Sequence, residues 1–153
     1  AALKEDAVDL QGMVSLEMLG YCDPRPGAQS LPRGLQDLYP DTGDFIAVIG
    51  NTYSQSLIDV FAAAMQCVDG LPVQKLAVPG NGELLQATRL SDHSPFWDAG
   101  FRALMITDTS FMRNPHYHLP SDTPETLDRR FLELVTAGCL EAVVALVEAG
   151  LDG

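Results

Sequence analysis

The chain has 153 residues and a mass of 16.5 kDa, which is the usual size of one domain. A domain of this length can bury a sufficient hydrophobic core without disulfides or structural metal ions. Hydrophobic residues make up 46% and charged residues 20%, which excludes a disordered, collagen-like or coiled-coil chain. Nine basic against 21 acidic residues give a net charge of −12, so we expect neither nucleic acid nor an anionic membrane surface as a partner. No apolar run approaches the ~20 residues that span a bilayer, and the N-terminal residues do not resemble a signal peptide. The sequence therefore predicts a soluble globular chain.

The first third of the chain predicts two strands separated by a long loop. Residues 12–20 alternate partly between apolar and polar side chains and are bounded by glycines, which indicates a short strand. Residues 22–43 contain four prolines and predict a surface loop. The continuous apolar run at residues 45–49 is typical of a central parallel strand.

A helix, a weak strand and a short helix are predicted next. Ser54 is placed as a helix N-cap, apolar residues follow it at helical spacing as far as Val68, and Gly70 is a stop signal. Residues 73–78 indicate a weak strand. After the turn around Asn81, residues 91–99 predict a short helix.

The last third predicts a buried strand, a polar loop and a long helix. Residues 103–107 form a second run typical of a buried strand, and residues 108–126 are rich in loop-forming side chains. Apolar residues from Leu127 to Val147 recur at helical spacing, which predicts an amphipathic helix that ends near Gly150. Strands that alternate with helices indicate an α/β sandwich.

Two groups of residues could carry chemistry. The three histidines, His93, His116 and His118, lie in one third of the chain near several acidic residues. The two at 116 and 118 could form a metal-binding pair on a strand, but flanking prolines favour a loop, in which a histidine is often only a surface residue. Glu17 lies in an otherwise apolar strand, so it is either turned outward to solvent, or paired or bound to metal at the carboxyl end of that strand.

Other familiar sites are not supported by the sequence. It contains no G-x-S-x-G elbow and no H-E-x-x-H helix, so the Ser-Asp-His-Ser run at residues 91–94 does not indicate a serine hydrolase, and a zincin helix is excluded. The three cysteines lack zinc-ligand spacing.

Four segments, in the same order, resemble the C-terminal half of metallopeptidase family 28. They are LEMLGY at 16–21, GDFIAVIGN at 43–51, SDHSPFW at 91–97 and NPHYHLPSDT at 114–123. The resemblance extends over nearly the whole chain, from about Gly12 to the last helix. It implies a zinc-exopeptidase-like α/β/α sandwich of three layers with a mixed, mostly parallel sheet. It also implies a two-zinc aminopeptidase, which hydrolyses N-terminal residues from peptides.

The resemblance also assigns roles to particular residues. Glu17 matches an acidic zinc ligand and His118 matches a late histidine ligand. Tyr117 matches a tyrosine that in some members donates a hydrogen bond to the tetrahedral oxyanion. Asp92 matches an acid that lines the substrate pocket, and His93 and His116 are expected to have supporting or structural roles.

The remaining ligands and the general base of the family should precede Glu17, but only 16 residues do so. We therefore expect residues 1–153 to be the C-terminal portion of one such domain, incomplete and inactive alone, with zinc absent or weakly bound. Two alternatives are a non-catalytic binding or assembly module of the same fold and an acyltransferase of the glutaminyl cyclase kind. The expected partners are a peptide substrate in the complete protein and a second copy of the chain bound through an exposed sheet edge.

Overall fold

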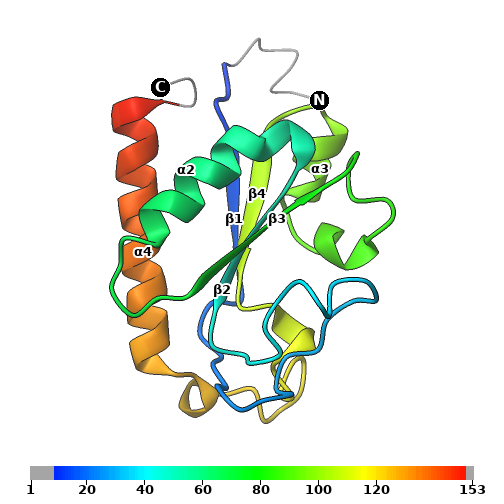
Figure 1. Cartoon of the computed structure of the whole chain (residues 1–153), viewed down its shortest axis with the longest axis vertical. Coiled ribbons are helices and arrows are strands. Elements are labelled where there is room, and N and C mark those ends of the chain that lie inside the picture. The colour runs from blue at the N-terminus through cyan, green and yellow to red at the C-terminus, as the bar shows by residue number, and fades with distance from the viewer. Residues whose placement is uncertain (1–8, 151–153) are drawn as a thin grey trace.

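An open four-stranded sheet forms the centre of the computed structural model, which describes residues 9–150. The strands are β1 (Met13–Glu17), β2 (Ile46–Asn51), β3 (Val73–Val78) and β4 (Ala103–Thr107), arranged in the order β1-β4-β2-β3 (Figure 1). β1 is parallel to β4 and β2 is parallel to β3, whereas β2 and β4 are antiparallel. The predicted α/β class with a mixed sheet is confirmed. The run at residues 45–49 does form a central strand, although only one of its two neighbours is parallel to it.

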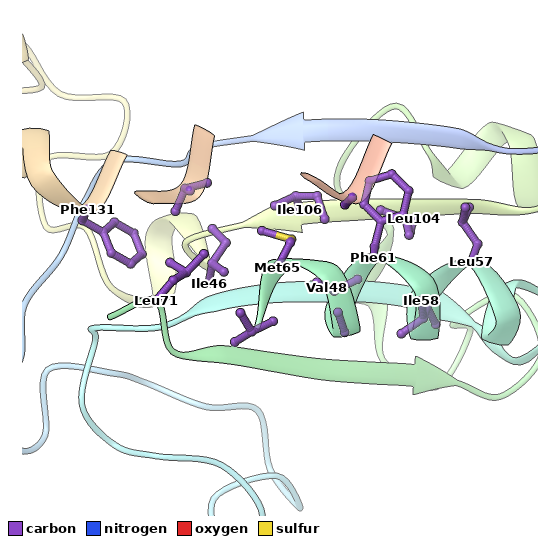
Figure 2. Close-up of a cluster of buried hydrophobic side chains, with 14 residues drawn as sticks. Ile46, Val48, Leu57, Ile58, Phe61, Met65, Leu71, Leu104, Ile106 and Phe131 are labelled. Atoms are coloured by element: carbon purple, nitrogen blue, oxygen red, sulfur yellow. The ribbon is translucent and has the colours of Figure 1, made fainter. Parts of the chain in front are cut away.

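Two helices cover one face of the sheet. They are α2 (Gln55–Met65) and the long α4 (Arg129–Ala149), which pack against each other (Figure 1). Their apolar faces and the inward side chains of the strands form the main core, which Figure 2 shows closely interleaved around Phe61 and Met65. Its buried members are Ile46, Val48, Leu57, Ile58, Phe61, Ala62, Met65, Leu71, Val73, Leu104, Ile106, Phe131, Val135 and Ala142.

The opposite face of the sheet is only partly covered. The short helix α3 (Ser94–Asp98) packs its Trp97 side chain against Val78 and Ala103, and the Trp97 indole donates a hydrogen bond to the carbonyl of Ala103 at 2.8 Å. Loops cover the rest of this face, in place of long helices. The second helical layer of the predicted sandwich, on the face opposite to α2 and α4, is therefore thin, and it leaves a groove over the sheet.

The predicted start of α2 at Ser54 is confirmed, whereas the end of α2 and the start of α4 differ from the prediction by a few residues. Ser54 occupies the N-cap position of α2, but its hydroxyl donates to Asn51 Oδ1 at 2.6 Å and accepts from the amide of Ala103 at 3.0 Å. The helix ends at Met65, and Gly70 follows a further turn with φ of +82°. α4 begins at Arg129 because Asp128 accepts a hydrogen bond from the amide of Phe131.

The carboxyl ends of β1 and β4 lie side by side, and the long loops leave the sheet there (Figure 1). The loop of residues 22–43 has no regular element beyond a single bridge between Asp23 and Gly43. The predicted loop at 108–126 contains two short 3-10 turns, η3 (Ser110–Met112) and η4 (Pro124–Thr126). None of the helices in the described part of the chain is long and apolar enough to cross a membrane.

Candidate functional site

Glu17 is the last residue of β1 and lies opposite Thr107 of β4. Its side chain is half-buried, and Ser91 Oγ donates a hydrogen bond to Glu17 Oε2 at 3.0 Å. Ser91 Oγ is also 2.6 Å from the hydroxyl of the buried Ser15. Because the one proton of Ser91 goes to the carboxylate, Ser15 must be the donor in the second bond. The carboxylate is thus held by Ser91, which is itself held by Ser15, and this favours a positioned group over a freely solvated one.

The groove on the second face of the sheet has a floor built from two rows of side chains. Strand register places Glu17, Thr107, Ala47 and Gln74 in one row across all four strands. The neighbouring row that lines the groove is apolar and consists of Met105, Ile49 and Leu76. These residues come from distant parts of the sequence, and only the pairing of the strands aligns them.

Three loops form the walls of this groove. The loop after β1 contributes Leu31, Leu35 and Tyr39, the segment before α3 contributes Leu85 and Leu90, and the loop after β4 contributes Phe111 and Tyr117. The space between them that the centre of a water molecule can occupy amounts to about 80 Å³, and the groove is open to solvent. Most of the lining side chains are apolar, so the groove suits a hydrophobic group next to a single carboxylate.

The structure brings Glu17 and Tyr117 to this one groove, from positions 100 residues apart in the sequence. His118 is exposed, has a left-handed backbone with φ of +58°, and stacks its ring on Tyr117 with the ring centroids 3.9 Å apart. The predicted ligand His118 therefore lies next to the predicted oxyanion donor Tyr117, but Tyr117 lines the groove and His118 does not. Their assigned roles remain predictions.

The predicted substrate-binding residue Asp92 is exposed and follows Ser91, the residue that holds Glu17. His93 is fully buried: its Nε2 donates to the carbonyl of Thr88 at 2.7 Å, and its ring meets Trp97 edge to face at 4.4 Å. Burial lowers the pKa of His93, so the imidazole is held neutral and fixes the segment that carries Ser91 and Asp92. His116 contacts the hydroxyl of Ser121 at 3.0 Å.

Asp108 was missed by sequence reasoning, although an acid directly after a buried strand is a usable signal. Its side chain is 1% exposed and accepts hydrogen bonds from the amides of Tyr21 and Ser110 at 2.8 and 2.9 Å. Its own amide donates to the carbonyl of Met18 at 2.7 Å. Burial raises the pKa of Asp108 to about 6 in spite of these hydrogen bonds.

Three residues with strained backbone conformations lie next to the Asp108 carboxylate. Met18, Thr109 and Ser110 have φ values of +50°, +74° and +53°, a region that residues with side chains rarely adopt. Thr109 follows Asp108 in the chain, the amide of Ser110 donates to the Asp108 carboxylate, and the carbonyl of Met18 accepts from the Asp108 amide. Such conformations persist only where surrounding contacts fix them, and they concentrate at functional sites. Asp108 thus holds in place the turn after Glu17 and the start of the loop that leads to Tyr117.

Arg113 is a second buried group that the sequence did not reveal. Its guanidinium donates to Gln29 Oε1 and to the carbonyl of Phe45, both at 2.9 Å, and lies 4.6 Å from the centre of the Phe45 ring. A Cβ on Gly43 would come within 2.9 Å of the Arg113 side chain, so this glycine makes room for the arginine. Arg113 therefore joins the loop after β4 to the loop that precedes β2, and residues of both loops line the groove.

Catalytic zinc takes three protein ligands, and residues 9–150 contain no group of three or more His, Cys, Asp or Glu side chains that could hold a metal ion. The described part of the chain therefore does not by itself fit the expected zinc centre.

Together, the mixed sheet and the groove beside the carboxyl ends of β1 and β4 define an α/β domain with a ligand site at the edge where such folds bind ligands. The chain belongs to peptidase family M28, whose family model matches residues 10–143. The resemblance noted from the four sequence segments is thereby confirmed.

One relative and two solved structures show how much of such proteins the chain represents. It is 39% identical over 129 residues to the uncharacterized protein YfbL of Escherichia coli strain K12, which covers 84% of this chain and 39% of YfbL. Two structures of the LapA aminopeptidase of Legionella pneumophila superpose with a TM-score of 0.63 at 18% and 19% identity. They cover 95% of this chain and 33% and 34% of LapA, and at such identity they show the fold alone. The chain thus spans between a third and two fifths of the length of these proteins.

Proposed function

We propose that this chain is the C-terminal portion of a zinc-dependent aminopeptidase, which hydrolyses N-terminal residues from peptides. In this proposal Glu17 and His118 each contribute one zinc ligand, Tyr117 donates a hydrogen bond to the developing oxyanion, and Asp92 lines the substrate pocket. The observation that carries the proposal is that Glu17 and Tyr117, in a chain of peptidase family M28, line one groove at the carboxyl ends of β1 and β4. The similarity of the fold to that of the LapA aminopeptidase adds support.

The chain's own residues have limited tasks in this proposal. Ser91 and Ser15 orient the Glu17 carboxylate, and Asp108 fixes the turn that follows it. Because the described residues do not bring three metal ligands together, the other ligands and the general base would come from elsewhere in the longer protein. The 153-residue chain alone is therefore proposed to be inactive.

A non-catalytic binding or assembly module is the second candidate. The exposure of His118 favours it, because a ring that contacts Tyr117 and solvent is not held in place for a metal. Within residues 9–150 the lack of a three-ligand group points the same way. The two candidates differ in whether the longer protein turns over a peptide.

The test is hydrolysis of aminoacyl anilides by the purified 153-residue chain with added zinc. We expect no useful turnover, because loss of general-base help alone costs about 10²–10⁴-fold. Robust turnover that a chelator abolishes would contradict the proposed inactivity.

The longer protein that contains this chain tests the assigned ligand. We expect His118→Ala to abolish turnover, whereas Leu119→Ala, at the exposed neighbouring position, should leave it unchanged. Circular dichroism would check that both variants are folded. A longer protein with no peptidase activity would favour the non-catalytic candidate.

A further inference from the structure

The floor of the groove is covered, although it belongs to the face of the sheet that lacks long helices. Thr107 and Ala47 line the groove, yet their side chains are 2% and 6% exposed. The space left for the centres of water molecules is about 80 Å³, whereas ligand pockets usually measure ~300–1,000 Å³. A ligand beside Glu17 therefore requires that some part of the groove wall moves away.

One segment of the first loop crosses this floor. The amide of Ser30 donates to the carbonyl of Met112, in the loop after β4, at 2.8 Å. The hydroxyl of Tyr39 donates to the carbonyl of Lys75, on β3, at 2.9 Å. Because β2 lies between β4 and β3 in the sheet, the chain from Ser30 to Tyr39 passes over β2, whose Ala47 lines the groove.

The chain is fixed on both sides of residues 31–40, which we call the flap. The amide of Gln29 donates to the carbonyl of Asp41 at 2.9 Å, so the two ends of the flap meet in a closed neck. Gln29 is buried, and its Oε1 accepts hydrogen bonds from Thr109 Oγ1 at 3.0 Å and from Arg113 Nε at 2.9 Å. A surface loop of this length with closed ends is an Ω-loop, a type that is frequently functional. The neck is thus anchored to the loop after β4.

The flap itself is bonded within its own chain more than to the sheet. The amide of Leu35 donates to the carbonyl of Pro32, and the amide of Leu38 donates to the carbonyl of Leu35, both at 3.0 Å. Pro32 and Pro40 further restrict the backbone. The flap meets the sheet through the Tyr39 hydroxyl and through half-buried apolar side chains such as Leu35. A segment of this kind moves as a unit at a lower free-energy cost than the core.

We propose that the flap swings about its neck and that this opening admits ligands to the groove beside Glu17. Opening breaks the hydrogen bond from Tyr39 to Lys75 and withdraws Leu35 from the groove, while the neck at Gln29 stays in place. Lids are drawn from the least stable parts of a fold, because they must move without unfolding the core. The proposal rests on the proposed function only in taking this groove as the ligand site.

The experiment is alkylation of introduced cysteines by N-ethylmaleimide in the 153-residue chain, followed at each thiol by mass spectrometry. Ala47→Cys reports on the floor beneath the flap, and Ala62→Cys, at a 2% exposed position of the main core, reports on unfolding. We expect Ala47→Cys to react at least ~10-fold faster than Ala62→Cys, because opening the flap costs less free energy than unfolding the core. Equal rates at the two positions would overturn the proposal.

A matched pair of variants tests the hydrogen bond that closes the flap. Tyr39→Phe removes the hydroxyl that bonds to Lys75, and Tyr53→Phe removes a hydroxyl at a 59% exposed position outside the groove. Loss of one hydrogen bond should speed alkylation of Ala47→Cys about 2–12-fold and leave Ala62→Cys unchanged, whereas Tyr53→Phe should change neither. Equal effects of the two tyrosine variants on Ala47→Cys would contradict the role given to Tyr39.

A second reporter needs no new residue on the floor. Should Ala47→Cys fail to fold, peroxide oxidation of Met105, which lines the groove, is compared with that of Met65, which is 0% exposed in the main core. Met105 should react faster, and Tyr39→Phe should raise its rate by the same factor. Neither reaction involves catalysis, so a longer protein without peptidase activity would refute the proposed function and leave the flap intact. Rates that reveal no opening would overturn the flap alone.

Discussion

Asp108→Asn should abolish a component of the pH dependence of folding that this one carboxylate produces. The side chain of Asp108 is almost fully buried, and burial raises its pKa from 3.8 to about 6. An acid that binds its proton more tightly in the folded chain than in the unfolded chain makes the folded state less stable as pH rises between the two pKa values. The window for this loss of stability is therefore from about pH 4 to about pH 6.

The size of this component follows from the shift. About two pKa units at 1.36 kcal/mol each amount to about 3 kcal/mol, present in full below pH 4 and lost above pH 6. Whether Asp108→Asn raises or lowers the free energy of unfolding at one fixed pH does not test this prediction. Asparagine removes the buried charge. However, the backbone amides of Tyr21 and Ser110 each donate to a different carboxylate oxygen of Asp108, and the single side-chain oxygen of asparagine can accept from only one of them.

The assay is urea unfolding, followed by circular dichroism, of the wild type and Asp108→Asn between pH 4 and pH 7.5. The free energy of unfolding of the wild type minus that of the variant should fall by about 3 kcal/mol as pH rises through the window. Taking the difference cancels the titration of His93 and of distant carboxylates. Leu38→Ala, at a 70% exposed position of the first loop, changes no titratable group, so it serves as the control and should give a flat difference. A flat difference for Asp108→Asn would refute the claim that this carboxylate is held at a cost.

Two further predictions concern stability. Phe61→Ala should lower the free energy of unfolding by ~3–5 kcal/mol, because Phe61 is 1% exposed in the middle of the main core (Figure 2). The control is Val147→Ala, at a 79% exposed position, which calorimetry should show within ~0.5 kcal/mol of the wild type. Asp128→Ala should cost ~1 kcal/mol, because its carboxylate accepts from the amide of Phe131 at the first turn of α4; an unchanged urea midpoint would show that this cap is dispensable.

The sequence determined the elements whose apolar pattern is local. The strand at residues 103–107 and the weak strand at 73–78 have the bounds that were predicted, and the long helix ends at the predicted glycine. These segments are identified by the period of their side chains alone, because a buried strand or an amphipathic helix must present apolar residues at fixed intervals. The four family segments likewise depend on the order of residues and on no contact between them, so the family could be inferred in advance.

The groove and its supporting groups were decided by tertiary structure. Glu17, Thr107, Ala47 and Gln74 share a row only because β4 pairs with β1 on one side and antiparallel with β2 on the other. No local pattern encodes strand order or register, which arise from packing between segments far apart in the chain. The buried Asp108 and Arg113 escaped prediction for the same reason. Both lie in a polar stretch that reads as a surface loop, and only the folded chain shows that the amides and carbonyls of other loops satisfy them.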